Sequence, residues 1–124
     1  MRPLSNAPAS TYRRIDLDAR IEASSGEDLT RICLEEAIAA LGQALFALER
    51  ESANPPREPL VRAQGIALWL ARAVAPENPL KTALTQFYGG VANAIRVSLA
   101  RPDPQLLSQV RNDLQDVLNA AHAA

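Results

Sequence analysis

The chain has 124 residues, of which 48% are hydrophobic, and its 13 lysines and arginines nearly balance its 14 aspartates and glutamates, for a formal net charge of −1. This length suits one domain built around a single core. A near-neutral chain lacks the positive field on which binding to a phosphate backbone relies, so nucleic acid is excluded as an expected partner.

Cysteine usage and hydropathy indicate the compartment. Cys33 is the only cysteine, so it can complete neither an internal disulfide nor a cysteine-based zinc cage, which suits a reducing cytoplasm. The first residues lack the apolar core of a signal peptide, and no run approaches the about 18 apolar residues of a membrane span. We therefore expect a cytosolic protein that does not insert into membranes.

The N-terminal part of the chain has two sections. Residues 1–11 are rich in proline, serine and alanine without periodicity, which is typical of a flexible tail. Between residues 12 and 24 apolar residues alternate with charged ones, and the apolar positions are Ile15, Leu17, Ala19 and Ile21. Because a lone strand would have no partner, this section is predicted to be an arm against the body or a short helical turn. Residues 12–124 then form one helical domain with an N-terminal arm at 12–24.

The first long helix is expected to begin at Ser25, whose hydroxyl can cap it, with Asp28 in the favourable first turn. Its apolar residues form one stripe with alternating spacings of four and three: Leu34, Ile38, Leu41, Leu45 and Leu48. The Ser-Ala-Asn-Pro-Pro segment at 52–56 ends this pattern.

Two further helices follow between proline-marked breaks. Pro59 suits the first turn of the second helix, whose Leu68 and Trp69 lie off its main stripe. The third helix has a nearly ideal stripe: Leu80, Leu84, Phe87, Tyr88, Val91, Ile95 and Leu99. Gly89 and Gly90 interrupt it, and each glycine costs about 1 kcal/mol relative to alanine in a helix interior. We therefore expect another backbone to approach closely there.

A fourth helix is predicted to open with Asp103 as its cap and Pro104 as its first residue. Its apolar positions are Leu107, Val110, Leu114, Val117, Leu118 and Ala121. Since short connections place sequential helices side by side, the four patterns predict an all-α fold, an antiparallel four-helix bundle.

Several of these segments together resemble the FliS family of flagellar secretion chaperones. Tyr12 matches the family's arm tyrosine, and Ile21–Leu29 is similar to its Val-x-Thr-Ala-Ser-Pro-x-x-Leu helix start. Arg62–Leu70 is similar to its Lys-Ala-x-x-Ile-Ile-x-x-Leu stretch, and Leu84–Val91 to its Leu-x-x-Leu-Tyr-x-Tyr-Met stretch. Asp103 stands where the family commonly has an aspartate that opens its last helix. The order and spacing of these segments carry the resemblance over nearly the whole folded chain.

The resemblance implies a cytoplasmic chaperone that binds the disordered C-terminal segment of flagellin, prevents premature polymerisation and assists delivery to the flagellar type III export apparatus. An export-gate component or a co-chaperone would be a further partner. The alternative is a non-catalytic adaptor or structural bundle that binds another flagellar or secretion component, or itself.

The candidate partner-binding residues are Tyr12, Ile15, Leu17, Ile21, Trp69, Phe87, Tyr88 and Val91. The first four either cover a partner groove and move aside on binding or form a permanently packed segment. The others either line the groove or belong to the core, and the hydroxyl of Tyr88 favours a boundary position.

Side chains for catalysis are sparse. The sequence has no glycine-rich phosphate loop, no Ser-His-Asp set and no paired metal ligands. Glu35 and Glu36 lack the Glu-x-x-His spacing of di-metal bundles and are interpreted as a solvated face. His122, the only histidine, lies in an alanine-rich terminus, which disfavours a phosphotransfer bundle. We expect a protein that is not an enzyme and that needs no cofactor or metal.

Overall fold

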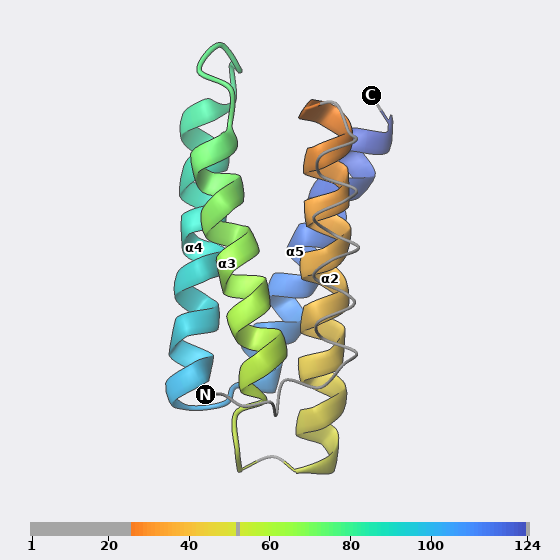
Figure 1. The fold of residues 1–124 in the computed structure, drawn as a ribbon, viewed down its shortest axis with the longest axis vertical. Coiled ribbons are helices and arrows are strands. Elements are labelled where there is room, and N and C mark those ends of the chain that lie inside the picture. The colour runs from red at the N-terminus through yellow and green to blue at the C-terminus, as the bar shows by residue number, and fades with distance from the viewer. Residues whose placement is uncertain (1–25, 52, 124) are drawn as a thin grey trace, which may run out of the picture. The chain divides into compact units, whose positions relative to one another are not determined.

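The computed structural model describes residues 26–51 and 53–123, and over these residues the chain forms four helices and no strand (Figure 1). The helices are α2 (Gly26–Arg50), α3 (Arg57–Ala73), α4 (Lys81–Ala100) and α5 (Pro104–Ala123). The predicted all-α four-helix bundle is confirmed. The tail at 1–11, the arm at 12–24 and the capping residue Ser25 lie outside the described residues.

The chain divides into two compact units, and the boundary falls inside α2, between Ile32 and Cys33. The first unit contributes the first two turns of α2 to the described residues. Glu27 and Asp28 lie in the first turn, where the helix dipole favours acidic side chains. Asp28 also forms an ion pair with Arg31 at 3.6 Å.

Within the second unit, α3 and α4 pack along each other as an antiparallel hairpin (Figure 1). Residues 74–80 connect the two helices, and Asn78 organises this connection. The backbone N–H of Asn78 donates to the carbonyl of Ala75 at 3.0 Å, and its Oδ1 accepts from the backbone N–H of Leu80 at 2.8 Å. These local hydrogen bonds satisfy polar groups that the turn would otherwise leave unpaired.

The start of α5 follows the prediction. Oδ1 of Asp103 accepts the backbone N–H of Leu106 at 3.1 Å, and its carbonyl accepts that of Leu107 at 3.0 Å. Pro104 is the first helical residue, where its missing N–H leaves no hydrogen bond unmade. The first-turn position of Pro59 is also confirmed, since α3 begins two residues before it.

Aliphatic side chains form the core. The large apolar side chains that are fully buried are Leu34, Leu41, Leu60, Ile95, Leu107 and Leu114. Of the stripe predicted on α2, only Ile38 and Leu45 are half-buried, and the other three residues are buried. Ser98 is fully buried as well, and its hydroxyl oxygen has no hydrogen-bond partner among the described residues.

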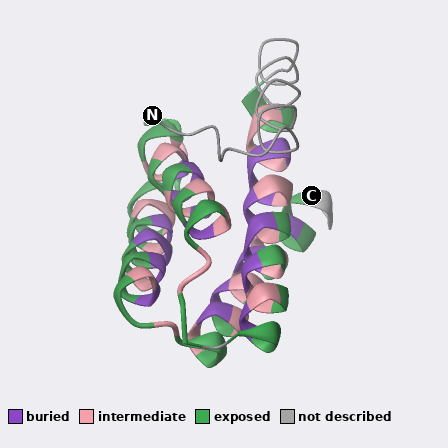
Figure 2. Ribbon diagram, turned by 60° about the horizontal axis from the view of Figure 1, so that its bottom comes forward, coloured by how far each residue is buried: buried purple, intermediate pink, exposed green. Residues whose placement is uncertain are grey.

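The expected close approach of another backbone at Gly89 and Gly90 is not found among the described residues. Both glycines are exposed, and a β-carbon added to either would meet no atom of this part of the chain within 4 Å. The core contacts the other side of α4, which carries Tyr88, Val91 and Ala92. Figure 2 shows buried and exposed residues on opposite sides of α3 and α4.

Candidate functional site

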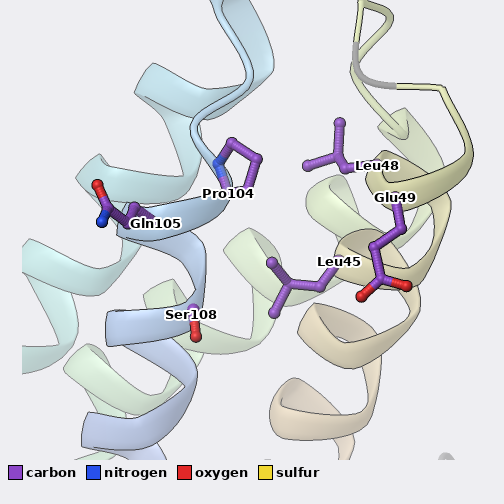
Figure 3. Close-up of a pocket in the computed structure, with 6 residues that line it drawn as sticks. All are labelled: Leu45, Leu48, Glu49, Pro104, Gln105 and Ser108. Atoms are coloured by element: carbon purple, nitrogen blue, oxygen red, sulfur yellow. The ribbon is translucent and has the colours of Figure 1, made fainter.

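A pocket of about 360 Å³ opens between the last turns of α2 and the first turns of α5 (Figure 3). It is lined by Leu45, Leu48, Glu49, Pro104, Gln105 and Ser108. In Figure 3 the side chains of Leu45 and Leu48 point toward α5, and the ring of Pro104 points toward α2. The volume lies near the lower end of the range of ligand pockets, about 300 to 1,000 Å³. We name this feature the α2–α5 pocket.

Helix periodicity brings the pocket residues together on each helix. Leu45, Leu48 and Glu49 are three and four residues apart, so they share one side of α2. Pro104 begins α5, and Ser108 lies on the same side one turn later. The two leucines and the proline ring offer hydrocarbon surface, and the polar groups lie beside it. This arrangement suits the binding of one or two apolar side chains of a partner.

The four predicted site residues on α3 and α4 lie outside this pocket. Trp69 and Phe87 are half-buried, whereas Tyr88 and Val91 are buried. The rings of Phe87 and Tyr88 contact each other, with centroids 5.4 Å apart and planes inclined by 57°. Burial raises the pKa of the Tyr88 hydroxyl above its ordinary value. Tyr88 and Val91 therefore pack in the interior.

The other four predicted site residues, Tyr12, Ile15, Leu17 and Ile21, lie outside the described residues.

Large apolar side chains are exposed on three of the described helices. They are Phe46 on α2, Val61 and Leu68 on α3, Leu80 at the start of α4, and Val97 on α4. Phe46 is 60% exposed, and the guanidinium carbon of Arg50 lies 5.7 Å from its ring centroid. Such side chains are available for contact with a partner.

A hydrogen bond of Arg62 links α3 to the part of α2 that belongs to the second unit. Its Nη1 donates to both carboxylate oxygens of Glu58, at 3.0 and 2.8 Å, and its Nη2 donates to Oε1 of Gln43 at 2.8 Å. Arg62 is only 14% exposed, so water screens these charge-assisted hydrogen bonds less than it would on an open surface. Glu58 is thereby neutralised within its own helix.

Cys33 is buried, as its place among apolar residues predicts. Burial, together with the nearby carboxylate of Glu36, raises the pKa of the Cys33 thiol from 9.0 to about 11. The thiol is therefore protonated at neutral pH, and a thiol in that state is a poor nucleophile.

This shift predicts a loss of stability in alkaline solution. The unfolded chain releases the thiol proton near pH 9, whereas the folded chain holds it to about pH 11, so the stabilisation is complete below pH 9 and is lost between these values. Linkage gives a loss of about 1 kcal/mol by pH 10. Urea unfolding at pH 8 and pH 10 measures it. The control is Cys33→Ala, which retains every other titrating group, and an equal pH dependence in both proteins would contradict the shift.

Sequence reasoning missed the pocket because it assigned Leu45 and Leu48 to the core stripe. One signal for the pocket was available in the sequence. Leu45 and Leu48 are the last residues of the stripe and lie just before the proline-marked break at 52–56, so they were expected at the end of a helix. No sequence pattern indicates which helix start lies opposite.

Two further observations concern metal binding and membrane insertion. Among the described residues, no three histidine, cysteine or carboxylate side chains gather closely enough to hold a metal ion. None of the described helices combines the length and hydropathy that a membrane span requires.

Comparison of the chain with protein-family models, with curated proteins and with solved structures gives no match.

Proposed function

We propose that this protein is a cytoplasmic export chaperone that binds the disordered C-terminal segment of flagellin, keeps it from polymerising and assists its delivery to the flagellar type III export apparatus. The order of FliS-like segments from Tyr12 to Asp103 supports this proposal. An export-gate component or a co-chaperone is the further partner in this proposal.

The α2–α5 pocket is the structural observation that supports it most directly. A disordered client has apolar side chains that would aggregate in water, and a pocket built from Leu45, Leu48 and Pro104 can take one or two of them out of water. The client segment is expected to form amphipathic turns as it binds, with its apolar side on the chaperone. The ordering of the client opposes binding, which keeps the complex releasable at the export apparatus.

The direct test is a calorimetric titration of the folded protein with the C-terminal segment of the cognate flagellin. We expect one-to-one binding with a negative heat-capacity change, because burial of apolar surface gives that change. A segment of equal length whose apolar residues are replaced by serine is the control and is expected not to bind.

The outcomes separate the proposal from its alternative. Absence of binding by a bundle that is demonstrably folded would overturn the client assignment and favour an adaptor with another partner. A mass that rises with protein concentration without any response to flagellin would favour self-association.

A further inference from the structure

The α2–α5 pocket has one charged side chain among its lining residues, that of Glu49. The other five are uncharged: Leu45, Leu48, Pro104, Gln105 and Ser108. In Figure 3 the side chain of Glu49 extends from the last turns of α2, and its carboxylate lies beside the side chain of Leu45. Glu49 is exposed, so a bound molecule can reach this carboxylate. Apolar surface and a negative charge therefore adjoin at the α2 edge of the pocket.

No described residue neutralises the charge of Glu49. It forms no ion pair or hydrogen bond with any residue of 26–51 or 53–123. Side chains three or four positions apart are neighbours on a helix, and no lysine or arginine stands at these distances from Glu49. The adjacent cation, Arg50, has its guanidinium carbon 5.7 Å from the ring centroid of Phe46. The carboxylate is therefore available to a cation of a bound partner.

The end of α2 adds to the negative charge at this edge. Glu49 is the residue before the last one of α2, and the carbonyl groups of a last turn carry partial negative charge. The helix dipole disfavours a carboxylate at this position and favours a cation, and Arg50 offsets a part of this charge. A second cation, supplied by a partner, would find the same favourable position.

Lysine and arginine fit both parts of this edge. Their side chains have a hydrocarbon stem that packs on apolar surface and a charged end that stays near water. An acidic side chain would be repelled by Glu49. A purely aliphatic side chain would remove water from the carboxylate without replacing the lost hydrogen bonds, which opposes binding.

We infer that Glu49 selects a lysine or arginine of the client, whose stem packs on Leu45 and whose charged end pairs with the Glu49 carboxylate, next to the apolar side chain that fills the pocket. The inference rests on the proposed function, because it concerns the residue that the client places at this pocket. Since the pair is exposed, it is expected to raise affinity only about two- to fivefold. Its larger effect is on the choice between clients, because a like charge at the same position is repelled.

The first measurement titrates Glu49→Gln and Glu77→Gln with the C-terminal segment of the cognate flagellin in a calorimeter. Glu77 is exposed in the connection between α3 and α4 and does not line the pocket, so its substitution removes the same charge elsewhere. At low ionic strength Glu49→Gln is expected to weaken binding about two- to fivefold, whereas Glu77→Gln leaves affinity unchanged. Added salt is expected to reduce the difference, because it screens exposed charges. Circular dichroism checks that both variants are folded.

An exchange of charges identifies the client residue. The lysines and arginines of the segment are replaced one at a time by glutamate, and each segment is titrated into Glu49→Lys and Glu77→Lys. These two proteins have the same net charge, so the general attraction of an acidic segment is equal in both. One segment variant is expected to bind Glu49→Lys more tightly than Glu77→Lys, because the exchange restores a pair of opposite charges.

The outcomes separate this inference from the proposed function. If the segment binds Glu49→Gln as tightly as Glu77→Gln, or more tightly, the inference is overturned and the client assignment stands. It is overturned in the same way if no segment variant prefers Glu49→Lys. If the segment does not bind the unsubstituted protein, the proposed function fails, and the inference fails with it.

Discussion

Replacement of Ile95 by alanine is expected to lower the free energy of unfolding by about 2 to 5 kcal/mol, the range for large-to-alanine substitutions in cores. Ile95 has no exposed surface and lies in the buried side of α4. Its truncation removes apolar contacts and leaves a cavity that packed neighbours fill only in part. Since small domains are stable by only about 5 to 15 kcal/mol, this single change removes a large share. Urea unfolding followed by circular dichroism measures it.

Val97→Ala is the matched control for this prediction. Val97 lies two residues away on the same helix and is 42% exposed, so its truncation creates no cavity. Its effect is expected to stay below about 1 kcal/mol, as surface substitutions usually do. Similar losses for both variants would mean that the two sides of α4 are assigned incorrectly.

Filling the α2–α5 pocket with Ser108→Phe is expected to weaken binding of the flagellin segment by about tenfold or more, equivalent to at least about 1.4 kcal/mol. Ser108 is half-buried and lines the pocket on α5. A phenyl ring at this position would occupy the space between Leu45 and Pro104 that the client side chain needs. Calorimetry with the C-terminal segment of flagellin, on protein shown by circular dichroism to be folded, gives the measurement.

The control for the pocket is Asn112→Phe. Asn112 is exposed on α5, one turn beyond Ser108, and it does not line the pocket. This variant adds the same ring and the same apolar area to the surface, so binding should stay within about twofold of the unsubstituted protein, less than about 0.5 kcal/mol. Unchanged binding in the Ser108 variant would show that the client does not use this pocket. Client binding as such would stand, and its surface would then have to be sought elsewhere.

Local signals predicted where α3 and α5 begin and where α2 ends. Asp103 and Pro104 open α5 because a side-chain acceptor and a residue without an N–H both suit a helix start, whatever the remainder of the chain does. The apolar stripe of α2 likewise predicted the burial of Leu41, because a period of 3.6 residues fixes which side chains share a side. Such patterns depend on neighbours within about four residues.

The same reasoning failed where the answer depends on a neighbouring helix. Gly89 and Gly90 were expected to meet another backbone, but they lie on the side of α4 that no described element covers. Ser98 gives the opposite case, since its side chain is fully buried although no pattern in the sequence indicates this. In both cases the helix itself was predicted correctly. The rotation of α4 relative to its neighbouring helices decides which of its side chains are exposed.

By itself, the sequence determined the all-α class, the proline-marked connections and most of the buried positions on α2 and α5, since hydrogen bonds and periodicity within a helix are local. Tertiary structure alone decided that Leu45 and Leu48 face Pro104 across an open pocket, and that no described element covers Gly89 and Gly90 on α4. Residues more than fifty positions apart meet only when helices pack. Packing depends on the summed shape of all the side chains at the contact, and no short stretch of sequence encodes that sum.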